Sequence, residues 1–138
     1  MKRKTLQRLL LLTGILLLAT TDIWAQNELD QNLFEPELVM EHQKAIGLTE
    51  SQKTVIIQEI QTAQAEFTKW QWELRSATDE LQEMIASQKV DESRTIQQLE
   101  KILELERNIK QIQMRLMIRI KNQLTRQQQE KLLALKKH

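Results

Sequence analysis

Apolar residues recur along the middle of the chain at alternating steps of four and three positions. One run covers residues 56–84, and a second covers residues 102–116 and continues to residue 124 in steps of four. This is the period of a helical seam that packs against another helix. A polar segment, residues 87–93, interrupts the pattern. We therefore predict two long helices, over residues 50–86 and 92–122, that fold back on each other at this break.

The same five-residue signal stands at both ends of this stretch. Leu48-Thr49-x-x-Gln52 opens it, and Leu124-Thr125-x-x-Gln128 closes it. In each case the Thr-x-x-Gln part is a capping box, in which the hydroxyl and the side-chain amide satisfy backbone N–H groups at the start of a helix. Because both threonines are equidistant from Ser87, an antiparallel hairpin brings the two motifs together at its open end.

Shorter helices are predicted outside the hairpin. Pro36 suits the first position of a helix and Gly47 its end, which indicates a helix over residues 36–46. The second capping box predicts a last helix over residues 126–136. The predicted fold is all-α, with residues 26–35 as a flexible lead-in and residues 36–138 as one helical-hairpin domain.

Residues 1–25 have the pattern of an export signal. A basic start is followed by an apolar run of eleven residues, Leu9 to Ala19, whereas about 20 are needed to span a bilayer. We predict cleavage after Ala25, with an uncleaved N-terminal anchor as the alternative. The remaining chain has 16 basic and 18 acidic residues. Export and this charge balance together argue against a nucleic-acid partner.

Apolar residues also lie off the two seams. They are Val55, Ile57, Trp72, Ile85, Leu103, Met114, Met117 and Ile118. A lone hairpin would expose them as a patch larger than soluble monomers usually carry. The pattern therefore favours a two-fold homodimer. The alternative is that the short end helices fold back over these residues.

The residue inventory argues against catalysis. After the signal the chain has a single glycine, Gly47, no cysteine, and only two histidines, His42 and His138. The chain therefore has few of the residues that form a phosphate-binding loop or a nucleophile–base pair, and we predict no enzyme and no cofactor. His42 is a weak candidate for a zinc, nickel or cobalt ligand, because no His-x3-His spacing accompanies it. Its more ordinary role is packing.

Charge is distributed unevenly along the chain. Residues 107–129 contain six basic residues and no acidic one, while residues 27–66 contain eight acidic residues and two lysines. Part of this pattern is expected to pair between the helices. However, Met114, Met117 and Ile118 are interleaved with the basic residues. A surface that is both basic and methionine-rich can hold unfolded chains by attraction and adaptable contact. The candidate residues for client or dimer contact are Ile57, Trp72, Arg107, Lys110, Met114, Arg115, Met117, Ile118 and Arg119.

Two Leu-Thr-x-x-Gln motifs that flank a helical hairpin behind an export signal resemble the Spy/CpxP family of periplasmic proteins. The resemblance covers residues 36–136. It implies a cradle-shaped, antiparallel helical homodimer in the periplasm. Such a dimer would bind unfolded envelope proteins without ATP, or act on a membrane-anchored stress sensor or anti-sigma regulator. It also implies a structural role for the motif residues Leu48, Thr49, Gln52, Leu124, Thr125 and Gln128.

The same superfamily includes periplasmic heavy-metal sensors and zinc-resistance-associated proteins, which gives the alternative function. In the nickel and cobalt sensors, a His-x3-His segment before the first long helix and a His-x3-Met segment before the second motif supply ligands. Here Leu38 stands four residues before His42, and Leu116 and Ile120 occupy the second pattern. The resemblance therefore implies the sensor scaffold with most of its metal site missing.

Overall fold

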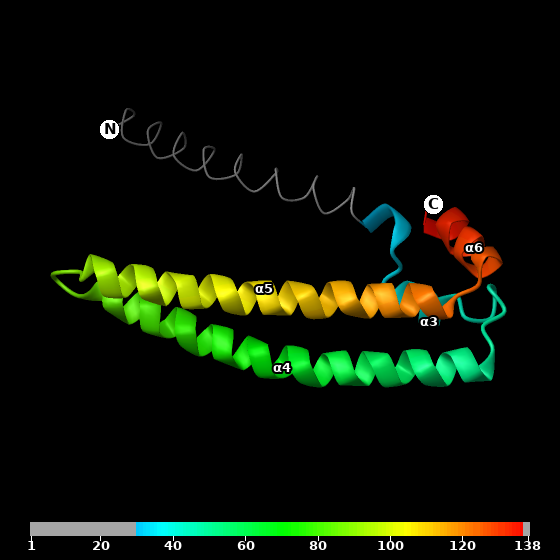
Figure 1. Ribbon diagram of the computed structural model, residues 1–138, viewed down its shortest axis with the longest axis horizontal. Coiled ribbons are helices and arrows are strands. Elements are labelled where there is room, and N and C mark those ends of the chain that lie inside the picture. The colour runs from blue at the N-terminus through cyan, green and yellow to red at the C-terminus, as the bar shows by residue number, and fades with distance from the viewer. Residues whose placement is uncertain (1–29, 137–138) are drawn as a thin grey trace, which may run out of the picture. The chain divides into compact units, whose positions relative to one another are not determined.

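The computed structural model describes residues 30–136, and all the regular structure in that range is helical (Figure 1). The chain divides into two compact units, Met1–Leu33 and Phe34–His138. The described part of the first unit, residues 30–33, contains a short 3-10 helix, η1 (Asp30–Asn32). The second unit contains the helices α3 (Pro36–Glu41), α4 (Glu50–Ala86), α5 (Glu92–Gln123) and α6 (Arg126–Lys136). The predicted export signal lies outside the described residues.

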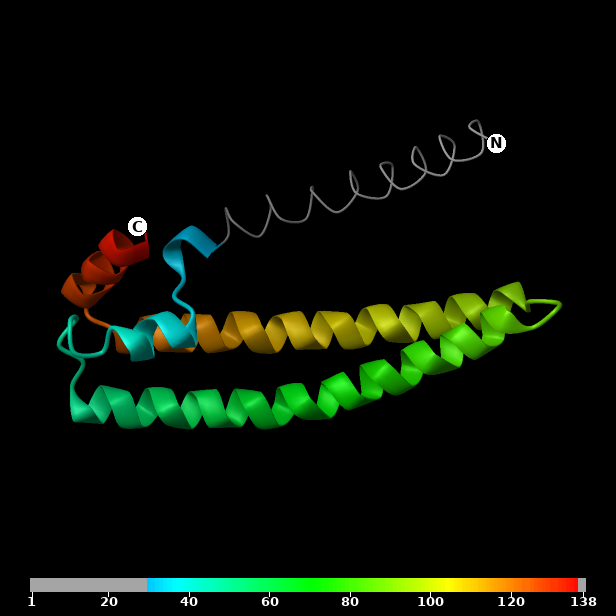
Figure 2. The ribbon, with the colours of Figure 1, turned by 180° about the vertical axis from the view of Figure 1, so that it is seen from behind.

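Helices α4 and α5 lie side by side along their length (Figures 1 and 2). The turn between them is defined by side chains at both of its ends. Ser87 is the C-cap residue of α4, and its hydroxyl lies within hydrogen-bond distance of two carbonyls, Met84 O at 2.8 Å and Lys89 O at 3.0 Å. The Asp91 carboxylate accepts from the Arg94 N–H at 3.1 Å and starts α5, as an N-cap does. The two long helices and the break between them are as predicted from the sequence.

The predicted seam forms two hydrophobic clusters. Near the turn, Ala77 on α4 is buried against Ile102 and Leu105 on α5. At the open end, all four helices contribute to a second cluster, which we call the open-end cluster: Phe34, Val39, Ile46, Ile56, Ile120, Leu124 and Leu132. The short helices α3 and α6 thus pack at the open end of the hairpin, and the middle of α4 and α5 keeps exposed outer faces.

The region before α4 differs from the prediction in two ways. Helix α3 ends at Glu41 rather than at residue 46. The Gln43 side-chain amide donates to the Met40 carbonyl, and the chain then turns through Gly47, whose φ is +70°. This turn directs Ile46 into the open-end cluster. Phe34, in the predicted flexible lead-in, is 1% exposed. A single aromatic residue ahead of a proline has no periodic partner, so the sequence pattern did not indicate its burial.

No helix in the described part of the chain has the length and apolar character needed to cross a membrane.

Candidate functional site

Thr49 and Thr125 start α4 and α6 with the same set of hydrogen bonds. The Gln52 N–H donates to the Thr49 hydroxyl at 3.2 Å, and the Thr49 N–H donates to Gln52 Oε1 at 3.0 Å. At the second motif the Gln128 N–H donates to the Thr125 hydroxyl at 3.2 Å, and the Thr125 N–H donates to Gln128 Oε1 at 2.9 Å. Both predicted capping boxes are therefore complete.

The two motifs meet, and their glutamine side chains bind each other. Gln52 Nε2 donates to Gln128 Oε1 at 2.9 Å, and Gln128 Nε2 donates to Gln52 Oε1 at 3.0 Å. Each amide also donates to the backbone carbonyl just before the other motif, Gln52 to Gln123 at 2.7 Å and Gln128 to Gly47 at 3.1 Å. We call these four hydrogen bonds the glutamine clasp. The clasp fixes the starts of α4 and α6 against each other.

The motif leucines complete this joint. Leu124 is buried, and Leu48 is half-buried against the open-end cluster. Neither leucine has an apolar partner four residues into its own helix, where Lys53 and Gln129 stand. Their burial instead comes from the other helices at the open end. The six motif residues therefore lie together, and they position the helices rather than offer a surface.

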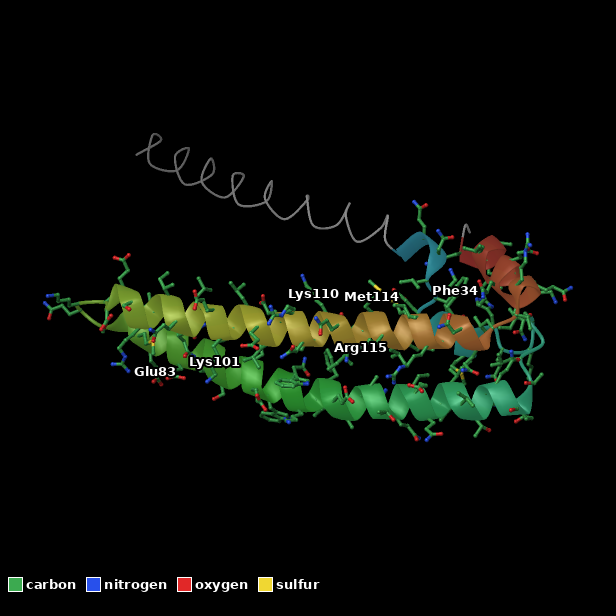
Figure 3. The ribbon with its side chains drawn as sticks, viewed as in Figure 1. Phe34, Glu83, Lys101, Lys110, Met114 and Arg115 are labelled. Carbon is green, nitrogen blue, oxygen red and sulfur yellow. The ribbon has the colours of Figure 1, made fainter. Side chains whose placement is uncertain are left out.

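Helix α5 carries the exposed surface that the charge pattern indicated. A shallow depression of about 390 Å³ lies along it, lined by Leu103, Glu106, Arg107, Lys110, Gln111 and Met114. Spacings of three and four residues put these side chains on one side of the helix. Lys110 and Met114 project from the edge of α5 that faces away from α4 (Figure 3).

Met117 and Ile118 continue this side of α5, because they follow Met114 by three and four residues. Met114 and Met117 are half-buried, and Ile118 is 43% exposed. We call Leu103, Arg107, Lys110, Met114, Met117 and Ile118 the basic apolar face. Arg115 is exposed beside it. Five of the six residues of this face, all except Leu103, were predicted from the interleaved pattern to form one surface with Arg115 and Arg119.

Arg119 has a partner within the hairpin. Its guanidinium donates to Glu59 Oε2 on α4 at 2.8 Å. This hydrogen bond and the charge of Glu59 raise the pKa of the Arg119 side chain, although burial opposes the shift slightly. Arg119 therefore belongs to the charge pairing between the two helices, which was the alternative expected for part of the basic segment.

Ile57 and Trp72 lie on α4, apart from the basic apolar face of α5. Ile57 is half-buried, whereas Trp72 is 69% exposed. Trp70, two residues earlier, packs in the seam, and the Lys69 ammonium lies 5.1 Å from its ring centroid, within the range of a cation–π contact. The predicted client or dimer residues therefore lie on two different helices.

Leu103 is a residue of the face that the predicted set left out. Its side chain is 54% exposed, and Ile96 and Leu99 on the same helix are also exposed. The signal was present in the sequence, because Ile96, Leu99 and Leu103 are spaced by three and four residues and lie off the seam.

Three of the positions that match the metal-sensor ligand patterns hold apolar residues that pack at the open end. Leu38 and Leu116 pack against the open-end cluster, and Ile120 is part of it. His42 is the C-cap residue of α3 and is half-buried. Within residues 30–136, no three histidine, cysteine, aspartate or glutamate side chains gather as a metal site would require. His138 lies outside the described residues.

Comparisons of the chain with protein-family models, with curated proteins and with solved structures find no match. Function is therefore inferred from the chemistry of the residues and from their arrangement.

Proposed function

We propose that this protein is an exported, periplasmic binding protein that holds unfolded polypeptides without ATP, and that its clients bind the basic apolar face of α5. The observation that carries the proposal is the mixture of flexible thioether, aliphatic and cationic side chains on one accessible helix face.

Each part of this mixture has a physical role in binding unfolded chains. Arg107, Lys110 and Arg115 attract acidic segments at long range and speed the encounter. Met114 and Met117 then adapt their unbranched side chains to whatever apolar sequence arrives. A depression this shallow does not enclose a small molecule, but it accommodates one side of an extended or helical peptide.

The resemblance to the Spy/CpxP family supports the same function and adds a second partner. This second candidate is a single membrane-anchored stress sensor in place of many clients. The two kinds of partner predict a different range of bound sequences. A broad client range is expected if adaptable methionines and charge dominate binding, and a single captured protein is expected if a specific sensor is the target.

The proposal is tested by aggregation of an unfolding client protein. We expect the protein, purified after export, to suppress light scattering at a several-fold molar excess in the absence of nucleotide. The double variant Arg107→Glu/Arg115→Glu should lose most of this effect, because it replaces attraction by repulsion on the face itself. Suppression by the wild-type protein should also weaken as salt is added.

Arg94→Glu/Lys101→Glu is the matched control. It changes the net charge by the same amount on the same helix, at exposed positions nearer the turn. We expect the control to retain suppression. Equal loss in both double variants, or no suppression by the wild-type protein, would contradict the proposal.

A further inference from the structure

Met114, on the basic apolar face, has a thioether that a dissolved oxidant can reach. The residue lines the open depression on α5, and it projects from the edge of the helix that faces away from α4 (Figure 3). It follows the buried seam residue Ile112 by two positions, which on a helix is a rotation of about 200° around the axis. The Met114 side chain therefore lies on the accessible side of α5, outside the packing between the two long helices.

The described methionines outside this face have more enclosed surroundings. Met40 packs against the open-end cluster. Met84 continues the seam of α4, three positions after Leu81, which packs in the cluster near the turn. Met40 and Met84 thus belong to the packed parts of the hairpin, whereas Met114 borders an open depression. The three thioethers are chemically alike, so their surroundings determine which one is oxidised first.

The sequence contains no cysteine, so a peroxide meets thioethers and no thiol. In the reaction with hydrogen peroxide, a lone pair of the methionine sulfur attacks one peroxide oxygen and the O–O bond breaks. The thioether gains that oxygen and becomes a sulfoxide, while the other oxygen leaves with both protons as water. The sulfur is oxidised by two electrons and the peroxide is reduced by two.

The sulfoxide changes what Met114 presents to an unfolded chain. Oxidation converts a flexible apolar side chain into a polar one, whose oxygen accepts hydrogen bonds. Lys110 precedes Met114 by four positions, and this spacing makes the two side chains neighbours on the helix surface. The Lys110 ammonium is thus placed to donate to the sulfoxide. Oxidation removes an adaptable apolar contact and engages one of the cations that attract clients.

We propose that Met114 is an oxidation site, and that its conversion to the sulfoxide by a peroxide lowers the affinity of the basic apolar face for unfolded chains. This inference rests on the proposed function and adds regulation to the same face. Clients bind while Met114 is a thioether and dissociate when it is a sulfoxide. Methionine sulfoxide reductases reverse the reaction, so reduction restores binding.

The oxidation site is tested without a client. The protein, purified after export, is incubated with hydrogen peroxide for increasing times, catalase removes the excess, and the masses of tryptic peptides give the oxidised fraction. Trypsin cleaves after Arg115, so that Met114 and Met117 fall in separate peptides. We expect Met114 to be oxidised at least about tenfold faster than Met40 and Met84, because a peroxide reaches it directly. Equal rates at these three positions, or faster oxidation of Met40 or Met84, would overturn the site.

The effect on binding is tested by aggregation suppression after catalase treatment. Oxidised wild-type protein should lose most of its suppression, and incubation with the reductases for both sulfoxide epimers should restore it. Met114→Leu keeps an apolar side chain of similar volume that peroxide does not oxidise, so this variant should suppress aggregation equally before and after treatment. Met114→Gln, which is polar without oxidation, should suppress weakly from the start. Circular dichroism should show unchanged helix content throughout.

Met84→Leu is the matched control, because it removes a methionine from the seam of α4. This variant should be as sensitive to peroxide as the wild-type protein. Full suppression by the oxidised wild-type protein, or loss of suppression in oxidised Met114→Leu, would overturn the regulation. The peptide masses involve no client, so a wrong order of oxidation leaves the proposed function standing. Failure of the unoxidised protein to suppress aggregation contradicts the proposed function and leaves the oxidation site standing.

Discussion

The side-chain amides of Gln52 and Gln128 have two roles. They cap the starts of α4 and α6, and they join two segments that are far apart in the sequence. Each side-chain oxygen accepts from its own capping threonine and from the other glutamine, and each NH₂ group donates twice. Gln128 is 6% exposed, so these donors have no ready replacement from water. A buried polar group that loses its partner costs more than the bond itself contributes.

Replacing Gln128 by glutamate should therefore loosen the open end of the hairpin. The substitution keeps the shape but removes both donors and places a carboxylate beside the Gly47 carbonyl. We expect a loss of about 1–3 kcal/mol in the free energy of unfolding, measured by urea denaturation. Gln127→Glu, at the exposed neighbouring position, is the control. Equal stability of the two variants would argue against the clasp.

At the residue scale, the sequence predicts the capping hydrogen bonds between neighbouring residues, but it does not predict the hydrogen bonds between Gln52 and Gln128. A capping box involves residues three positions apart, so its spacing alone predicts it. The box uses only the side-chain oxygen of each glutamine, and nothing in the sequence says where the NH₂ groups go. The same holds for Gln98, a polar residue in the seam whose amide donates to Ala77 O at 2.8 Å and to Glu80 at 3.1 Å.

The packing of α4 against α5 near the turn depends on one small residue. Ala77 is 1% exposed, and the Gln98 amide reaches its carbonyl across the interface. A larger side chain at this position has no space to enter. The pairing of Ala77 with Gln98 therefore sets how closely the two helices approach in this part of the seam.

Ala77→Leu should separate the helices at this point. Overpacking a tight contact costs about 1–3 kcal/mol, and the lost Gln98 hydrogen bond adds to it. Thermal unfolding followed by circular dichroism measures the effect. Ala65→Leu makes the same change at an exposed position of α4 and should leave the melting temperature nearly unchanged. A wild-type melting temperature for Ala77→Leu would contradict this account of the seam.

Helices with a long run of periodic apolar residues were predictable from the sequence, whereas elements whose ends depend on tertiary contacts were not. Both long helices span more than eight turns, so their alternating apolar steps specify them and their caps specify their ends. Helix α3 is shorter than predicted, because burial of Ile46 through the Gly47 turn outweighs the continuation of the helix. No local sequence pattern indicated that Phe34 is buried with Val39 of α3 in the open-end cluster.

At the scale of the whole molecule, the surfaces that pack the hairpin together are separate from the surface proposed to bind clients. The seam and the open-end cluster account for the buried apolar residues, and the clasp closes the joint between the motifs. The outer side of α5 is left with alternating apolar and charged residues that no other described element covers. The composition of this side was predictable from the sequence, and so was some pairing of charges between the helices, but the sequence did not show that Arg119 in particular pairs with Glu59.

The claim that unfolded chains bind the basic apolar face is tested most directly by site-specific photo-cross-linking. A photoreactive amino acid is placed at Met114 on α5 or, as a control, at the exposed Gln61 on α4, and a labelled unfolded polypeptide is added before irradiation. The account predicts strong labelling from position 114 and weak labelling from position 61. Equal labelling from both positions, or labelling mainly from position 61, would contradict it.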